Sequence, residues 1–130
     1  MVVVLDASVL IAHLDGRDAY HLRAVEVLLA ARRLTFVASV VTVAEVLVGP
    51  VRVGAGATAA AALRALRLVC EPLAPGGAEK LAELRAETGL KLPDCCVLLA
   101  ALDTGAKGII TFDERLGGAA LAAGFEVRPG

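Results

Sequence analysis

The sequence predicts an α/β fold in which helices cover both faces of a mainly parallel sheet. Short runs rich in Val, Leu and Ile alternate along the chain with longer segments of helical periodicity, which is the pattern of βαβ units. The first of these runs, Met1–Leu5, is apolar throughout, as expected of a strand that is buried on both faces. A chain of 130 residues is long enough to bury one core, so we expect a single domain over residues 1–130.

The composition excludes several classes of protein. Hydrophobic residues make up 58% of the chain and charged residues 21%, so the chain is not disordered. Charged residues interrupt every long apolar stretch before it reaches the roughly 18 to 20 residues of a membrane span, and the N-terminus does not resemble a signal peptide. We therefore expect a soluble, cytoplasmic protein that does not bind a membrane. The net charge of −1 gives no overall nucleic-acid footprint, so a nucleic acid would have to bind a local patch.

The elements of the first half follow from periodicity and from turn residues. Apolar residues at helical spacing predict a helix over Asp18–Ala31, with Asp18 in its first turn. A strand is expected over Leu34–Ala38 and a helix over Val41–Val48, which Gly49-Pro50 should end. The Gly- and Ala-rich segment Val53–Thr58 is predicted to be a loop.

The second half continues the same alternation. Glycines mark the ends of three helices, at Gly89, Gly105 and Gly124. The expected elements are a helix around Leu63 and Leu66, a strand over Leu68–Cys70, a helix over Ala78–Thr88, a helix from Pro93 with an apolar stripe of Val97, Leu98, Ala101 and Leu102, a strand over Gly108–Phe112, a helix over Asp113–Ala123 and a strand over Phe125–Val127.

The sequence gives little support for catalysis or metal binding by cysteine, histidine or serine residues. Cys70, Cys95 and Cys96 show no metal-binding spacing and are interpreted as small apolar core residues. His13 and His21 fall in the N-terminal helical region and are interpreted as helix-surface residues. No serine lies in a G-x-S-x-G motif, and neither a G-x-x-x-x-G-K-[ST] nor a G-x-G-x-x-G motif is present.

Four acidic residues are predicted to meet at one edge of the sheet. Asp6 ends the first strand and Asp113 follows the Gly108–Phe112 strand, while Glu45 and Asp94 are expected in the first turns of two helices. In βαβ units these helices start at the carboxyl edge of the sheet, where ligands bind. Helix capping is the alternative explanation: Thr42 to Glu45 and Thr111 to Glu114 fit capping boxes, and Asp94 and Asp113 suit helix N-termini.

Two observations favour a site over capping alone. Glu45 is the only charged residue between Leu34 and Val51, and a carboxylate in an apolar setting is costly without a partner or a cation. Asp94 lies on the same helical face as apolar core positions and should point inward. Clustered carboxylates favour a hard cation such as Mg²⁺ or Mn²⁺, and the reaction that such a site suits is phosphodiester hydrolysis.

Four motifs in this order resemble the PIN-domain family, and more closely its VapC-type toxins of bacterial toxin–antitoxin pairs. The motifs are Val4–Leu10, Thr42-x-x-Glu45, Leu92-Pro93-Asp94 and Thr111–Leu116. The resemblance implies a three-layer α/β/α sandwich, Rossmann-like in form, with the activity of a Mg²⁺- or Mn²⁺-dependent endoribonuclease. It also implies a homodimer that acts on RNA and is neutralised by a VapB-type antitoxin whose tail occupies the acidic groove.

The resemblance also assigns roles to particular residues. It implies that the metal-binding, catalytic acids are Asp6, Glu45, Asp94 and Asp113. The hydroxyls of Ser8 and Thr111 match positions that orient these carboxylates through hydrogen bonds.

The chain departs from the family pattern at one position. Some members carry a further acid two residues after the T-x-D aspartate, where this chain has Arg115. Glu114 is therefore an alternative ligand, and Arg115 could contact an RNA phosphate. Other candidates for phosphate contacts are Arg17, Arg52, Lys91 and Lys107, although ordinary surface charge is the favoured explanation for each of them.

Three other functions are compatible with parts of the pattern. A haloacid-dehalogenase-like phosphatase also has an Asp after its first strand, but Asp6-Ala7-Ser8 lacks the second acid of its D-x-D motif. A non-catalytic PIN-like module could bind only RNA or a protein. A housekeeping RNA-processing nuclease would use the same four acids without being a toxin.

Overall fold

The computed structural model describes residues 1–130 and contains five strands and seven helices. The strands are β1 (Val2–Leu5), β2 (Thr35–Ser39), β3 (Val69–Glu71), β4 (Gly108–Ile110) and β5 (Glu126–Arg128). The helices are α1 (Ala7–Leu14), α2 (His21–Ala30), α3 (Val40–Arg52), α4 (Gly56–Ala65), α5 (Gly77–Thr88), α6 (Leu92–Thr104) and α7 (Glu114–Ala122).

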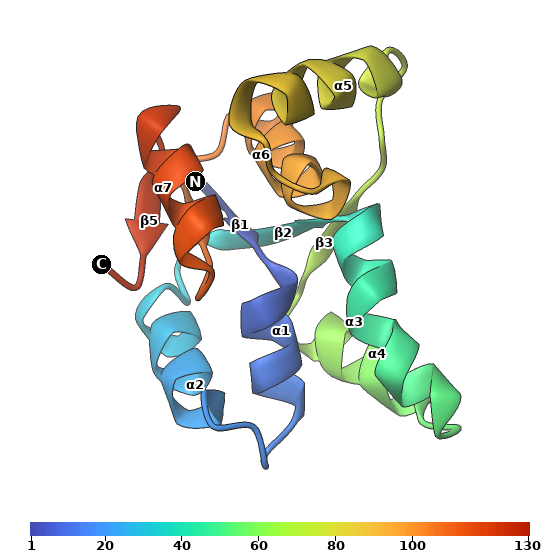
Figure 1. Cartoon of the computed structure of the whole chain (residues 1–130). Coiled ribbons are helices and arrows are strands. Elements are labelled where there is room, and N and C mark those ends of the chain that lie inside the picture. Colours follow the sequence, from blue (N-terminus) through green and yellow to red (C-terminus); the bar gives the residue numbers. More distant parts are fainter.

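All five strands join one parallel sheet in the order β3-β2-β1-β4-β5, which confirms the predicted α/β class (Figure 1). The first strand lies in the middle, where Val4 is in register with Val37 of β2 and Ile109 of β4. Because every strand runs in the same direction, all five carboxyl ends lie along one edge of the sheet. The polar residues that follow β1 and β4 therefore emerge side by side.

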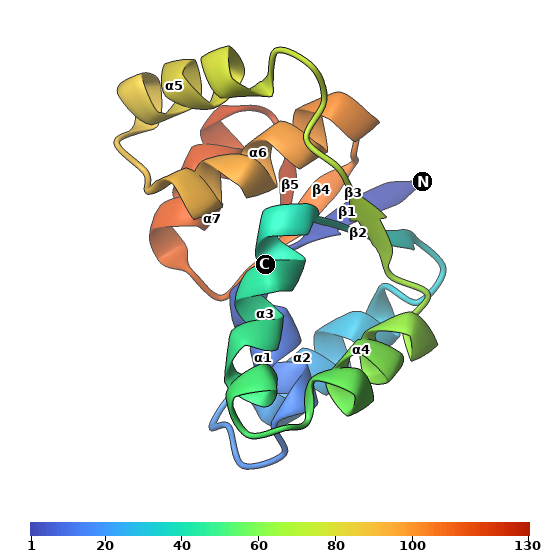
Figure 2. The ribbon, with the colours of Figure 1, turned by 90° about the vertical axis from the view of Figure 1, so that its right-hand side faces the viewer.

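Helices cover both faces of the sheet, as predicted, and form a three-layer sandwich (Figure 2). Side chains alternate between the faces along each strand. Val3 and Leu5 of β1 pack into a core with α1, α2, α3 and α4, whereas Val4 packs into a second core with α6 and α7, which α5 extends. Since the central strand is buried on both faces, its end is a rigid support for the residue that follows it.

Helix α6 is buried more completely than the predicted apolar stripe implies. Each of the seven residues from Cys95 to Ala101 is buried, whereas Leu102, which was assigned to the stripe, is 53% exposed. The expected ends are confirmed, with a proline in the first turn and Gly105 in the left-handed conformation at a φ of 62°. The buried length of this helix fixes Asp94 at its N-terminal end.

Several predicted boundaries are wrong in the first half of the chain. Helix α1 was not predicted as a separate element, and α2 begins at His21 because Asp18 instead accepts a hydrogen bond from the backbone of Tyr20 in the turn before it. Helix α3 passes through Gly49-Pro50 and ends at Arg52. The proline costs one intrahelical hydrogen bond near the C-terminal end without stopping the helix.

Smaller corrections concern a predicted loop and two side chains. Helix α4 begins at Gly56, inside the segment that was predicted to be a loop. Cys95 and Cys96 are buried as predicted, but Cys70 is exposed on the edge strand β3. His13 is half-buried and not a surface residue, because α1 packs against α2 and α3. No helix of this structure is long and apolar enough to span a membrane.

Candidate active site

Asp6 is the most firmly held of the four acids. Its backbone N–H donates to the carbonyl of Ile110 at 3.0 Å, which continues the pairing of β1 with β4. Its side chain is 6% exposed, and its Oδ2 accepts hydrogen bonds from Ser8 Oγ and Thr111 Oγ1, each at 2.8 Å. None of the side-chain hydrogen bonds uses Oδ1, so one carboxylate oxygen is oriented by the protein and the other is left for a ligand.

The two hydroxyls also tie the turn after β4 to Asp6. Thr111 Oγ1 accepts the backbone N–H of Asp113 at 2.9 Å, and Ser8 Oγ accepts that of Phe112 at 3.1 Å. Each hydroxyl is thus a donor to the carboxylate and an acceptor for the backbone. The structure therefore places Ser8 and Thr111 where sequence reasoning expected them, in hydrogen-bond contact with an acid of the site.

Asp113 is the N-cap of α7, since its Oδ1 accepts from the backbone of Arg115 at 2.9 Å and of Leu116 at 3.2 Å. The predicted capping box from Thr111 to Glu114 is therefore wrong, because the Thr111 hydroxyl bonds to Asp6 and to the backbone of Asp113 instead. Capping occupies one oxygen of Asp113 and leaves the other free of hydrogen bonds.

The predicted capping box from Thr42 to Glu45 is also wrong. Ser39 caps α3, whereas Thr42 is fully buried within the helix and its hydroxyl has no partner. Glu45 consequently lies in the second turn of α3 and not in the first. Its side chain is exposed, so its solitary position among apolar residues in the sequence does not mean that it is buried.

Glu45 and Asp94 nevertheless lie close to the other acids. Although Glu45 is exposed to solvent as a residue, partial desolvation of its carboxyl group raises its pKa, and the charges of Asp6 and Asp94 raise it further. Burial likewise raises the pKa of Asp94, as do Asp6 and Asp113, while Lys91 and Arg115 oppose the increase. The four acids that sequence reasoning selected therefore lie close enough for their charges to interact. The pKa values of two of them, Glu45 and Asp94, are raised by burial and by these charges.

An open hollow of about 410 Å³ lies over three of these acids. Lys91 and Arg115 line it too, which places both cations on the same side of the site as Asp94. Its lining residues are Glu45, Leu90, Lys91, Pro93, Asp94, Asp113 and Arg115. The alternative ligand Glu114 is exposed and does not line this hollow.

Lys107, another candidate for phosphate contacts, lies elsewhere. It precedes β4 at the amino edge of the sheet and pairs with Glu126 at 3.9 Å. It is therefore remote from the acids.

The oxygen-only donor set fits a hard divalent cation such as Mg²⁺ or Mn²⁺. Neither Glu45 nor Asp94 has a hydrogen bond or an ion pair to its side chain, and their mutual repulsion is the kind that a cation relieves. The side chains do not form a finished cage, since no group of three or more His, Cys, Asp or Glu residues is arranged to hold a metal ion. The side chains of the exposed Glu45 and the half-buried Asp94 would have to rotate before the acids could surround a metal ion.

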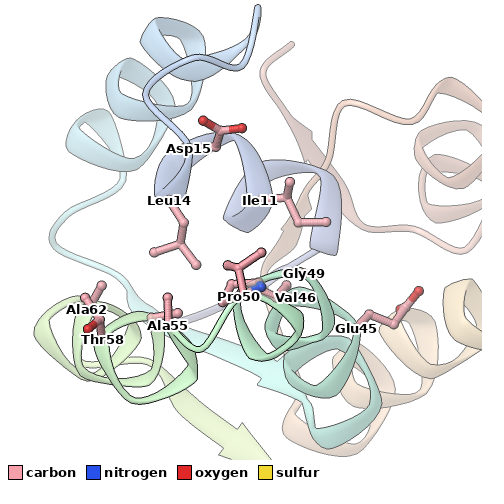
Figure 3. Close-up of a pocket in the computed structure, with 12 residues that line it drawn as sticks. Ile11, Leu14, Asp15, Glu45, Val46, Gly49, Pro50, Ala55, Thr58 and Ala62 are labelled. Atoms are coloured by element: carbon pink, nitrogen blue, oxygen red, sulfur yellow. The ribbon is translucent and has the colours of Figure 1, made fainter.

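A second, apolar groove adjoins the acids between α1, α3 and α4, with a volume of about 530 Å³ (Figure 3). Ile11 and Leu14 of α1 face Pro50 and Ala55 across it, and the carboxylates of Asp15 and Glu45 lie at its margins. Glu45 lines both hollows, so the groove and the acidic site adjoin at this side chain. Sequence reasoning missed this groove because it depends on α1, which was not predicted, and on the continuation of α3 through Pro50.

A five-stranded parallel α/β sandwich with four acids gathered at the carboxyl edge is the architecture of a PIN domain. The PIN-domain family profile matches residues 3–120, and the chain belongs to this family. The resemblance seen in the four sequence motifs is therefore confirmed. No curated protein sequence matches the chain.

Solved structures share the fold over nearly the whole chain. One is VapC20 of Mycobacterium tuberculosis, described as a toxin that cleaves the sarcin-ricin loop, with 22% identity, a TM-score of 0.75, and coverage of 95% of this chain and 96% of that one. A toxin–antitoxin complex from Klebsiella pneumoniae matches with 25% identity, a TM-score of 0.72, and coverage of 88% and 89%. VapBC2 from Rickettsia felis, bound to a promoter DNA fragment, matches with 16% identity, a TM-score of 0.70 and coverage of 98% of each chain.

Proposed function

We propose that this PIN domain is a Mg²⁺- or Mn²⁺-dependent endoribonuclease and the toxin of a VapBC-type pair. The observation that carries the proposal is the acidic edge itself, where Asp6 is oriented by two hydroxyls and lies close to Glu45 and Asp94. The similarity to solved toxin and toxin–antitoxin structures supports the toxin assignment.

In this proposal Asp6, Glu45, Asp94 and Asp113 hold the divalent cation. A bound Mg²⁺ or Mn²⁺ supplies a Lewis acid that polarises the phosphate and increases the acidity of a water molecule. The protein contributes orientation, because the Asp6 carboxylate is fixed before the substrate arrives. Lys91 and Arg115 contribute positive charge in the same hollow as Asp94, where a phosphate would otherwise be repelled.

We expect products with 5′-phosphate and 3′-hydroxyl ends. These ends result when a water molecule activated by the cation attacks the phosphate, and neither histidine, the commonest general base for attack by the RNA 2′-hydroxyl, lines the acidic hollow. His21 Nδ1 is bonded to the carbonyl of Ala12 at 2.8 Å, and burial lowers the pKa of His13. Detection of 2′,3′-cyclic phosphate ends would contradict this mechanism.

The antitoxin would bind in the apolar groove between α1, α3 and α4. Apolar side chains of an amphipathic segment would contact Leu14 and Val46, and a basic residue of that segment would reach Glu45 at the entrance to the acidic site. A cation from the antitoxin would then compete with the metal ion for the carboxylates. We also propose a homodimer, for which exposed apolar residues of α6 such as Leu92 and Leu102 are available.

The test is cleavage of a labelled, structured RNA by antitoxin-free protein with Mg²⁺, with Mn²⁺ or with EDTA. Wild-type protein is compared with Asp6→Asn and Asp94→Asn, which keep the shape of each side chain and remove its charge. We expect metal-dependent cleavage that both substitutions abolish. Circular dichroism of each variant shows whether it is folded, and metal-independent cleavage or full activity of folded Asp94→Asn would refute the proposal.

A further inference from the structure

Two of the four aromatic side chains of the protein stack on each other directly beside the acidic site. The rings of Tyr20 and Phe112 have centroids 5.5 Å apart and an interplanar angle of 28°. Phe112 lies between Thr111 and Asp113 in the chain, and its backbone N–H donates to the hydroxyl that orients Asp6. The stack is therefore held in a fixed position next to the acids.

The guanidinium of an arginine lies over both aromatic rings. The Arg23 guanidinium lies 5.3 Å from the ring centroid of Tyr20 and 5.2 Å from that of Phe112. Arg23 is exposed and forms no salt bridge, and Tyr20 is 48% exposed. The group thus combines a half-exposed aromatic ring with a guanidinium that forms no salt bridge.

A second arginine lies near Arg23. A hollow of about 340 Å³ is lined by Arg23 and Arg128, with Glu26 as its one acidic residue. The backbone carbonyl of Arg128 accepts the N–H of Thr111 at 3.0 Å, so this hollow is tied to the same turn as Asp113. This part of the surface therefore carries the acids, the two stacked rings and two arginines, Arg23 and Arg128.

We propose that Tyr20, Phe112 and Arg23 form a stacking subsite for one unpaired base of the RNA substrate, and that Arg128 contacts an adjoining phosphate. Unpaired bases expose the faces that stack on aromatic rings and guanidinium planes, whereas bases in a duplex do not. The subsite thus selects single-stranded RNA, a loop or a bulge. The inference rests on the proposed nuclease function, since the acids next to the subsite define the phosphate that is cut.

A direct test uses the fact that the chain contains one tyrosine and no tryptophan. Protein labelled with 3-fluorotyrosine gives a single ¹⁹F resonance, from Tyr20. The Asp94→Asn variant is used so that the RNA remains intact. We expect a short oligoadenylate to shift this resonance, and we expect neither an abasic oligomer with the same phosphates nor an RNA duplex of equal length to do so.

Affinities measured by fluorescence anisotropy then assign the roles. Tyr20→Leu keeps an apolar side chain but has no aromatic face, and should weaken oligoadenylate binding roughly 5- to 150-fold, the range for loss of one stacking ring. Tyr20→Phe should retain the affinity, and Arg23→Gln should reduce it. The matched control is Arg64→Gln, an exposed arginine on α4 that has no contact with the rings.

Several results would overturn the inference. If oligoadenylate binds but leaves the ¹⁹F resonance unchanged, or if folded Tyr20→Leu binds as tightly as the wild type, the rings only anchor the start of α2. Failure of the nuclease proposal has a different signature, because the wild-type protein would then cleave nothing while the base-dependent shift of Tyr20 persisted.

Discussion

Replacement of Thr111 by valine should damage both the stability of the protein and its site. The hydroxyl of Thr111, which is 5% exposed, donates to Asp6 at 2.8 Å and accepts from the backbone of Asp113 at 2.9 Å. A hydrogen bond to a charged group contributes about 1.5 to 3 kcal/mol and a neutral one about 0.5 to 1.5 kcal/mol. Thr111→Val, which keeps the shape and loses both bonds, should therefore lower the free energy of unfolding by about 2 to 4 kcal/mol.

The same substitution should reduce activity about 10- to 100-fold, the usual effect of removing a group that orients a metal-binding side chain. Asp6 keeps its bond to Ser8, so the loss should be partial and should diminish at high Mg²⁺ concentration. Urea denaturation followed by circular dichroism measures the stability, and RNA cleavage over a range of Mg²⁺ concentrations measures the site. Thr111→Ser, which keeps the hydroxyl, is the control.

The reasoning would be refuted if Thr111→Val were folded and matched Thr111→Ser at every Mg²⁺ concentration. In that case the orientation of Asp6 by hydroxyl groups would have no bearing on metal binding or on cleavage. A loss of activity without a loss of stability would contradict only the calculated hydrogen-bond contribution.

Three further predictions concern charge, metal and backbone. Because the pKa values of Glu45 and Asp94 are raised on folding, the folded chain retains protons that the unfolded chain releases, so these carboxylates destabilise the metal-free protein above their raised pKa values. Glu45→Gln and Asp94→Asn should therefore raise the melting temperature at neutral pH. This increase should become smaller at about pH 4, where the carboxyl groups of the wild type are protonated. An increase of the same size at both pH values would contradict the prediction. Saturating Mg²⁺ should stabilise the wild type, by about 2.7 kcal/mol at a hundred times its Kd, and chelation with EDTA should reverse the effect; Asp94→Asn should respond much less in the same thermal melts. Gly108→Ala should destabilise the fold by about 1 to 3 kcal/mol or more, since its Cβ would lie 2.6 Å from the carbonyl oxygen of Glu126, whereas Gly118→Ala on α7 has nothing within 4 Å and should be neutral or stabilising in urea denaturation.

The fold and the position of the acids were predictable because they depend on the pattern of apolar, proline and glycine residues within short segments of the sequence. The apolar run before Asp6 and the Pro93-Asp94 helix start specify a parallel sheet with acids at its carboxyl edge, and the structure has both. Capping was misassigned at Thr42 and at Thr111, because the competing partners of a hydroxyl lie in other elements and cannot be read from local spacing.

The rest of the site depends on contacts between distant segments. The stack of Tyr20 on Phe112 joins the start of α2 to the turn after β4, and no periodicity relates these positions. The one available signal was composition: the chain has four aromatic residues, one Tyr and three Phe, and one of them directly precedes an acid of the site. The exposure of Glu45 was likewise hidden, since a charged residue within an apolar segment can lie on its solvent face.

The hydrogen bond from Thr111 to Asp6 also determines when the site can exist during biosynthesis. Asp6 precedes Thr111 by 105 residues, so β4 and the hydroxyl that orients this acid are synthesised long after it. The central strand β1 therefore lacks one of its two neighbouring strands until β4 has been translated. A nascent chain that has not yet reached Thr111 cannot assemble the acidic centre, so the proposed nuclease would be inactive at that stage of translation.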